Sequence, residues 1–388
     1  MANKRVLSDE ILAGFDKYKY NAVDTSPLSN YVMHPFWNWC VKLVPMWVAP
    51  NVLTLTGFLL LVFNFLVMIY YDLDFYGASL DHPEFPPVPN WVWLLCAFNN
   101  FMSHTLDGID GKQARRTGTS SPLGELFDHG LDSWASFFLP VAMYSVYGRG
   151  EYGADTYSVY LVLLGVNFCF IASHWEKYNT GILFLPWGYD LSQIGMTAVY
   201  LITFFCGYEV WKFSVFGMTT GNIFIIVMWV ALAISIPITL WNIYIGYHNK
   251  TGKMLSLQES VRPLVSTVLL FALMITWSRY SSYDIINRHT RIFYTTTGTV
   301  FSNIACRLII AQMSNTRCEL VNRLLIPLFT IVMVTCLLNL GVLEFYILTG
   351  YCIYVLASHI HFGFCVVSDL CEHLNIQAFS IEPVLTTA

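Results

Sequence analysis

Apolar residues recur in blocks of about twenty along this 388-residue chain, and polar or Pro/Gly-containing stretches separate the blocks. A helix of about twenty apolar residues crosses the hydrocarbon core of a bilayer. Only 12% of the residues are charged, about half of what a soluble domain carries. The sequence therefore predicts an all-α integral membrane protein. About ten transmembrane helices are expected, over residues 52–71, 91–113, 123–147, 157–175, 190–210, 222–247, 261–278, 293–313, 324–346 and 349–367.

The first fifty residues are more polar than the blocks that follow. They predict a short polar helix with Ser8 or Asp9 as its N-cap. In residues 27–50, several tryptophans and a tyrosine are mixed with Lys42. Aromatic and basic residues together are typical of a segment that lies on the membrane surface. We therefore expect residues 1–50 to form a cytosolic, interfacial helix segment without a removable signal peptide.

The distribution of lysine and arginine predicts how these helices are oriented. Most of the 20 basic residues fall on the side of the membrane that holds the N-terminus. By the positive-inside rule, this distribution places both termini in the cytosol.

The net charge is −5 and the chain has no basic stripe, which argues against nucleic acid as a partner.

The second and third blocks are interrupted by ionisable residues, which are costly at membrane depth and indicate function. At about 100° per residue, one face of the second block holds Asp107, Asp110, Gly111, Ala114 and Arg115. One face of the third block likewise holds Gly124, Glu125, Asp128, His129 and Asp132. Gly111, Ala114 and Gly124 are small, which predicts a close approach of the two helix backbones. The two acidic faces would then meet.

Four carboxylates would converge between these faces. Such charges repel strongly in a poorly hydrated site, so either some are protonated or cations hold them. Oxygen ligands suit hard ions such as Mg²⁺ or Mn²⁺. Two divalent ions would balance four carboxylates and can clamp a pyrophosphate. The alternative is a structural network in which the carboxylates pair with Lys112, Arg115 and Arg116, or a solvated helix end.

The spacing of these residues resembles the complete signature of the CDP-alcohol phosphotransferase family, whose members are also called phosphatidyltransferases. The matching pattern is Asp107-x-x-Asp110-Gly111-x-x-Ala114-Arg115, eight intervening residues, and Gly124-x-x-x-Asp128-x-x-x-Asp132. The segments FDKYKYNAVDTSPL, YVMHPFWN and SHWEKYNTGILFLPWGYD resemble the animal ethanolaminephosphotransferases. The resemblance implies catalytic helices over residues 51–215. Residues 216–388 would then supply C-terminal helices for the lipid chamber, for dimer contacts or for both.

The resemblance also implies a role for each matching residue. Two Mg²⁺ or Mn²⁺ ions would be held by the four aspartates, Asp107, Asp110, Asp128 and Asp132. The site of the CDP-alcohol would be lined by Asn51, Lys112, Arg115 and Glu125. Among these, Arg115 matches the position that holds the phosphates of the nucleotide, a task that suits its planar guanidinium.

His129 is the expected base of the reaction, with Glu125 as its partner. The two residues are four positions apart, so they can touch on a helix. A carboxylate bound to an imidazole sets its tautomer and raises its basicity. Two alternatives stay open: His129 only orients Asp128 or Asp132, or Asp132 is itself the base.

The resemblance implies that phosphoethanolamine passes from CDP-ethanolamine to diacylglycerol, which gives phosphatidylethanolamine and CMP. Gly108 and residues 131–134 resemble the ethanolamine-using members, whereas choline-using members tend to have alanine at the first of these positions. CDP-choline, alone or beside CDP-ethanolamine, is the alternative donor. A membrane transporter is the alternative from another class. The expected location is the endoplasmic reticulum or Golgi membrane, with the active site facing the cytosol, membrane lipids around it and a homodimer as a further expectation.

Overall fold

The structure is a computed structural model that describes residues 5–185 and 187–381. The described residues form thirteen α-helices and two small sheets. The helices are α1 (Asp9–Phe15), α2 (His34–Cys40), α3 (Pro50–Tyr71), α4 (Asn90–Thr117), α5 (Pro122–Tyr147), α6 (Thr156–Thr180), α7 (Gly188–Cys206), α8 (Thr220–His248), α9 (Leu257–Tyr280), α10 (Ile285–Arg288), α11 (Thr290–Ser314), α12 (Leu325–Leu337) and α13 (Leu343–Leu374). The paired strands are β1 (Ala22–Val23) with β2 (Leu183–Phe184), in parallel, and β3 (Ser214–Val215) with β4 (Met218–Thr219), antiparallel.

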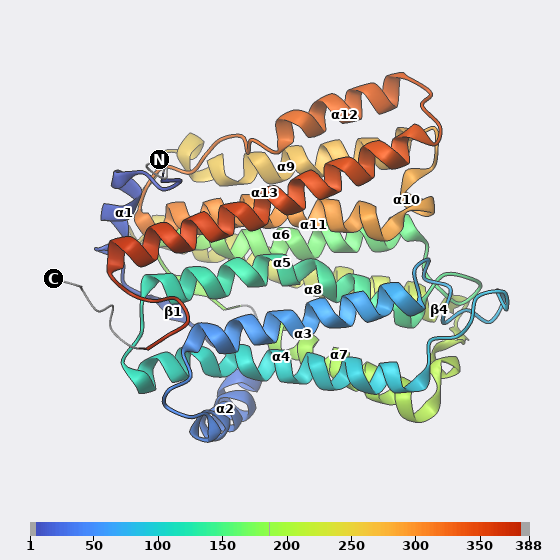
Figure 1. Cartoon of the computed structure of the whole chain (residues 1–388), viewed down its shortest axis with the longest axis horizontal. Helices are drawn as coiled ribbons and strands as arrows, with labels where there is room; N and C mark the ends of the chain where they lie inside the picture. Colours follow the sequence, from blue (N-terminus) through green and yellow to red (C-terminus); the bar gives the residue numbers. More distant parts are fainter. Residues whose placement is uncertain (1–4, 186, 382–388) are drawn as a thin grey trace.

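Ten of the described helices, α3 to α9 and α11 to α13, overlap the ten predicted blocks. They lie side by side in one bundle (Figure 1). Among the described residues, α3, α6, α8, α9 and α13 are long and apolar enough to cross a membrane. The most outward-facing of these is α8, since only 6% of its apolar window is buried inside the protein. The prediction of an all-α integral membrane protein is confirmed.

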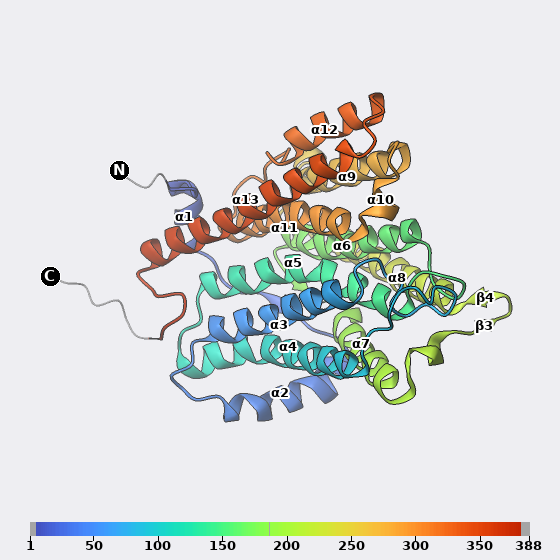
Figure 2. The same cartoon turned by 45° about the vertical axis from the view of Figure 1, so that its right-hand side comes forward.

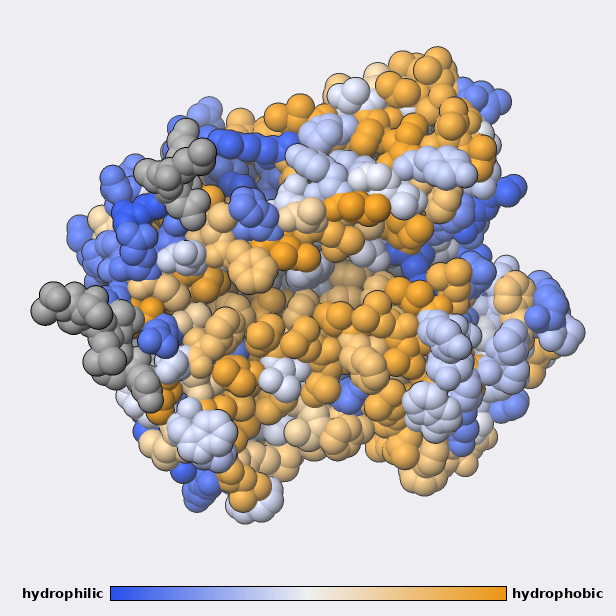
Figure 3. Space-filling view, viewed as in Figure 1, coloured by the Kyte–Doolittle hydropathy of each residue, from blue (hydrophilic) through white to orange (hydrophobic). Residues whose placement is uncertain are grey.

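The surface of the bundle divides into zones along the helix axes. Figure 3 shows apolar side chains across the middle of this face, with hydrophilic residues gathered mainly toward the two ends of the helices. Large apolar side chains of α8, among them Trp229, Ile234 and Trp241, are exposed. This distribution is the one expected when the helices cross a bilayer and their ends reach water.

The innermost helix is α11, and almost all of its residues are buried. It packs against α5, α6 and α13, and Figure 2 shows it between α13 and α6. At Gly298 it approaches α5 so closely that an added Cβ would overlap with the ring of Phe137. The missing side chain at this position therefore sets the distance between α5 and α11.

Replacing Gly298 with alanine should destabilise the protein. The added methyl group overlaps with Phe137, and overpacking of this kind typically costs about 1–3 kcal/mol of the free energy of unfolding. Gly350→Ala on α13 is the matched control, because a Cβ there meets no atom within 4 Å and alanine favours a helix over glycine. We expect the midpoint of thermal unfolding in detergent to fall for Gly298→Ala only. Equal midpoints for the two variants would contradict the close approach of α5 and α11.

The N-terminal segment folds back onto the last helices of the bundle. Ser8 caps α1, since its side chain accepts a hydrogen bond from the backbone N–H of Ile11. The backbone N–H groups of Val6 and Leu7 donate to Oδ2 of Asp369 on α13. The apolar side of α1 packs against α11 and α13. In the segment that follows, Trp37 of α2 is buried, whereas Trp39 of α2 and Trp47 beyond it are exposed.

One end of the bundle gathers the segments that surround the acidic helices. Figure 1 shows α1, β1, the start of α3 and the turn between α4 and α5 at this end. Strand β1 pairs with β2, which precedes α7, so the N-terminal segment is also tied to the connection between α6 and α7. The chain after α13 returns to the same end, where the Phe379 ring lies edge-on to Phe127 on α5.

Candidate active site

A tight turn joins α4 to α5 and makes the two acidic helices antiparallel. Helix α4 ends at Thr117, and Gly118 follows with a left-handed φ of 71°, which glycine adopts without strain. Ser121 caps α5 by accepting a hydrogen bond from the backbone N–H of Gly124, and Pro122 occupies the first helical position. The local sequence thus ends one helix and begins the next, which leaves both acidic faces at the same end of the bundle.

Three of the four predicted aspartates converge between these helices. Asp107 and Asp110 on α4 and Asp128 on α5 each offer a carboxylate oxygen, and these oxygens lie within 4.8 Å of one another. Asp132 lies one turn further along α5 and is not in this group of described residues. Oδ1 of Asp128 is buried and has no hydrogen-bond partner. An unpaired buried carboxylate oxygen within a group of oxygens fits a hard divalent cation.

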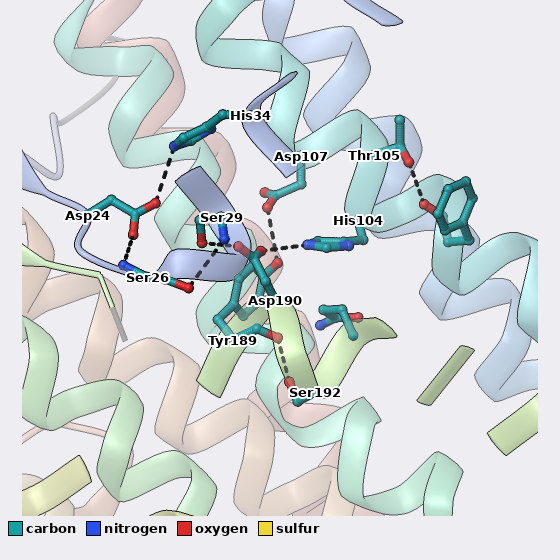
Figure 4. Close-up of polar contacts among 12 residues, drawn as sticks. Asp24, Ser26, Ser29, His34, His104, Thr105, Asp107, Tyr189, Asp190 and Ser192 are labelled. Carbon is teal, nitrogen blue, oxygen red and sulfur yellow. Dashed lines mark hydrogen bonds and ion pairs between the residues drawn. The ribbon is translucent and has the colours of Figure 1, made fainter. Parts of the chain in front are cut away.

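Hydrogen bonds from other parts of the chain hold two of these carboxylates. The Thr54 hydroxyl on α3 donates to Oδ2 of Asp110 at 2.5 Å, and the backbone N–H of Gly111 donates to its Oδ1. The Tyr189 hydroxyl, in the first turn of α7, donates to Oδ2 of Asp107 at 3.0 Å (Figure 4). Because each carboxylate oxygen has two lone pairs, both carboxylates can still bind a cation.

The close approach of α4 and α5 that the small residues predict is not observed. Helix α3 packs against both of them and lies between them (Figures 1 and 2). An added Cβ on Gly111 would first meet the guanidinium of Arg115, at 3.5 Å, and one on Gly124 would first meet Oδ1 of Asn51, at 3.6 Å. Gly111 and Gly124 therefore lie beside Arg115 and Asn51, and neither packs against the opposite acidic helix.

The four residues predicted to line the CDP-alcohol site are not all brought together. Asn51, in the first turn of α3, donates from its amide to the backbone oxygen of Ala378 at 2.9 Å. Arg115 is exposed near the end of α4. Lys112 points toward α2, where its Nζ donates to Oδ1 of Asn38 at 2.8 Å. Asn51 and Arg115 therefore lie beside Gly124 and Gly111 of the signature, whereas Lys112 is turned toward α2.

His129 and Glu125 lie one turn apart on α5 but do not hydrogen-bond to each other. Nδ1 of His129 is 4.0 Å from Oε1 of Glu125, and its Nε2 is 3.7 Å from Oδ2 of Asp128. His129 is buried, and its Nδ1 has no hydrogen-bond partner. An unpaired imidazole nitrogen beside carboxylates can accept a proton from a nearby hydroxyl.

Sequence comparison relates this chain to known proteins. The family model for CDP-alcohol phosphatidyltransferase matches residues 47–247, which include every predicted site residue. The chain belongs to this family. Human ethanolaminephosphotransferase 1 is 49% identical over 389 residues, which cover 98% of this chain and 96% of that protein. The mouse protein of the same name is 47% identical over 385 residues, with the same coverage of 98% and 96%. Choline/ethanolaminephosphotransferase 2 of Arabidopsis thaliana is 32% identical over 397 residues, covering 95% of this chain and 97% of that protein.

Membership in this family sets aside the transporter alternative.

Two further residues, outside the spaced signature, surround the Glu125 carboxylate of this phosphatidyltransferase. Nζ of Lys177 on α6 lies 2.6 Å from Oε1 of Glu125, and the Tyr18 hydroxyl lies 2.6 and 2.7 Å from its two oxygens. Burial and the Glu125 charge raise the pKa of the Tyr18 hydroxyl above its usual value. Tyr18 therefore stays protonated and remains a hydrogen-bond donor.

Reasoning from the sequence missed Tyr18, Lys177 and Tyr189. Each contacts a carboxylate that is far away along the chain, so the contact cannot be predicted from the spacing of neighbouring residues. A weaker signal was present, because the stretches FDKYKY, SHWEKYN and PWGYD place charged and hydroxyl-bearing residues among aromatic ones.

Proposed function

We propose that this protein transfers phosphoethanolamine from CDP-ethanolamine to diacylglycerol and releases phosphatidylethanolamine and CMP. The observation that carries the proposal is the convergence of Asp107, Asp110 and Asp128 at one end of a membrane helix bundle. Such a site can bind a water-soluble, negatively charged donor through cations while the lipid acceptor stays in the bilayer. The choice of ethanolamine follows from the nearly full-length similarity to the ethanolaminephosphotransferases of human and mouse.

We assign two Mg²⁺ or Mn²⁺ ions to the four aspartates, Asp107, Asp110, Asp128 and Asp132. When bound, the ions would neutralise the pyrophosphate and stabilise charge on the entering and leaving oxygens. The unpaired Oδ1 of Asp128 and the all-oxygen donor set support this assignment. Thr54 and Tyr189 hold Asp110 and Asp107, so these carboxylates are oriented before a substrate arrives.

In this proposal, Asn51 and Arg115 hold the CDP part of the donor. Asn51 lies beside Gly124 and Arg115 beside Gly111, on the two helices that carry the aspartates. A guanidinium binds phosphate oxygens through two parallel hydrogen bonds. The Asn51 amide gives up its hydrogen bond to the backbone oxygen of Ala378 when it binds the nucleotide.

His129 takes the proton of the diacylglycerol hydroxyl as that oxygen attacks the phosphorus that carries ethanolamine. A P–O bond forms to the lipid oxygen, the bond from this phosphorus to the CMP oxygen breaks, and CMP leaves with the electron pair. The unpaired Nδ1 of His129 supports this role. Glu125 contacts Lys177 and Tyr18 and would stabilise the charged imidazole. Asp132 is the alternative base.

The alternative donor is CDP-choline, alone or together with CDP-ethanolamine, and the name of the Arabidopsis relative includes both head groups. At Gly108, which resembles the ethanolamine-using members, an added Cβ would overlap with the indole ring of Trp37. The alanine of choline-using members would therefore require α2 to move away from α4.

The location and assembly of the protein belong to the same proposal. We place it in the endoplasmic reticulum or Golgi membrane. Both termini would lie in the cytosol, and the aspartates would face it. The gathering of both terminal segments at the end of the bundle that holds the turn between α4 and α5 supports this orientation (Figure 1). Residues 51–215 would form the catalytic unit. Residues 216–388 would supply the lipid chamber and the contacts of a homodimer.

A comparison of donors tests the proposed function. Protein purified in detergent and supplied with diacylglycerol and Mg²⁺ should release CMP from CDP-ethanolamine about tenfold faster than from CDP-choline, or more. Tenfold corresponds to about 1.4 kcal/mol of differential binding in the transition state. The same assay without diacylglycerol measures hydrolysis of the donor. Equal rates would assign the protein to the dual-specificity class, and no release from either donor would contradict the proposed function.

A further inference from the structure

The first turn of α7 contacts α4 through two consecutive residues. The Tyr189 hydroxyl donates a hydrogen bond to Oδ2 of Asp107 at 3.0 Å. Oδ1 of Asp190 lies 2.8 Å from Nε2 of His104, which is one helical turn before Asp107 (Figure 4). Two neighbouring contacts of this kind fix both the distance and the rotation of α7 relative to α4.

The second of these contacts is buried, and both of its side chains have further partners. The side chains of His104 and Asp190 are 1% and 7% exposed. The Ser29 hydroxyl donates to Oδ2 of Asp190, so both oxygens of this carboxylate have partners. The His104 ring lies edge-on to Trp37 on one side and to Tyr189 on the other, with ring centres 5.4 and 5.7 Å apart. The position of the Tyr189 ring is therefore determined by contacts that do not involve the metal site.

Hydrogen bonds to a metal-binding carboxylate usually decide which way its free oxygen points. Removal of such a partner typically costs about 10–100-fold in metal affinity. Asp110 receives hydrogen bonds from Thr54 and from the backbone N–H of Gly111. For Asp107, the corresponding donor is the Tyr189 hydroxyl. It comes from a different helix, so it can restrain the carboxylate independently of α4.

We propose that Tyr189 is a positioning residue, which orients Asp107 for the divalent ions and is itself held by the contact of Asp190 with His104. The inference rests on the metal assignment of the proposed function. It extends the set of residues that control metal binding from α4 and α5 to α7, and through Ser29 to the N-terminal segment.

Tyr189→Phe tests this inference, because it removes the hydroxyl and keeps the ring against His104. Two quantities are measured: the Mn²⁺ concentration that gives half of the metal-induced rise in thermal unfolding midpoint, without substrates, and the Mg²⁺ concentration for half-maximal CMP release. We expect both to increase about tenfold or more, with the metal-free unfolding midpoint unchanged. Tyr200→Phe is the matched control, because Tyr200 is a buried tyrosine further along α7. Both concentrations should stay at wild-type values in this control.

The possible results separate the inference from the assignment on which it rests. Wild-type metal concentrations in Tyr189→Phe would overturn the role of Tyr189 alone. A lower metal-free unfolding midpoint with unchanged metal concentrations would overturn it too, since the contact would then only stabilise the fold. A wild-type protein that gains no thermal stability from Mn²⁺ would overturn the metal assignment and the inference with it.

Discussion

Asp128→Asn should abolish CMP release, with a loss of about a thousandfold or more in kcat. The substitution keeps the size of the side chain but removes its charge and turns one carboxylate oxygen into an amide. Oδ1 of Asp128 is buried without a hydrogen-bond partner. Asp107, Asp110 and Asp128 each contribute one carboxylate oxygen to the group that could hold a metal ion. The loss of one charged ligand removes several kcal/mol of charge stabilisation, and a thousandfold loss corresponds to about 4 kcal/mol.

The measurement compares CMP release with the effect of Mn²⁺ on the thermal unfolding midpoint. Both should be lost together in Asp128→Asn, since the variant no longer holds the ions. Asp155→Asn is the matched control, because Asp155 caps α6 by accepting a hydrogen bond from Ser158 and asparagine caps a helix equally well. More than about a tenth of wild-type activity in Asp128→Asn would contradict a metal-binding role.

His129→Ala should lower kcat by about a hundredfold to ten-thousandfold, the usual range for removal of a general base. We expect this loss because Nδ1 of His129 is buried, has no hydrogen-bond partner and is therefore free to accept a proton. The dependence of kcat on pH gives a second readout. If His129 accepts the proton, the rise of kcat with increasing pH in the wild-type protein is absent from the variant.

The same variant distinguishes a base from a residue that only orients a ligand. Nε2 of His129 lies 3.7 Å from Oδ2 of Asp128, so an orienting role would change metal binding. We expect the Mn²⁺ concentration for half of the thermal stabilisation to be unchanged in His129→Ala. His361→Ala, at an exposed position on α13, is the control for loss of an imidazole. Full activity in His129→Ala would transfer the role to Asp132 or to water, and weaker metal binding would favour the orienting role.

The positions of the long helices could be predicted from the sequence because bilayer thickness imposes a length that apolar blocks reveal directly. The same holds for the acidic faces, since Asp107 and Asp110 share a face of one helix and Asp128 and Asp132 share a face of the next. These are properties of single helices. The separation of α4 from α5 depends on a third helix, because α3 lies between them. The small residues on α4 and α5 could not predict the position of α3.

Contacts between distant segments were likewise out of reach. Tyr18 and Glu125 are 107 positions apart, and Lys177 and Glu125 are 52 positions apart. For Lys112, the sequence predicted a place in the site that the structure does not show. Its place beside the signature suggested a role in the CDP-alcohol site, but its direction is set by α2, where Asn38 accepts its hydrogen bond. Such pairings depend on how helices are arranged around the site and not on the spacing within any of them.

The attachment of the N-terminal segment to α11 and α13 has a consequence for biosynthesis. The ribosome makes residues 5–15 long before it makes α11 and α13, which hold them, the latter through Asp369 among others. Until then, α1 lacks the apolar residues of α11 and α13 and has only Leu123 and Leu126 of α5 among the other buried residues of its cluster. A nascent chain with all four aspartates already in the membrane therefore still lacks two of the helices that hold α1, the helix that leads to Tyr18 and its contact with the carboxylate next to His129.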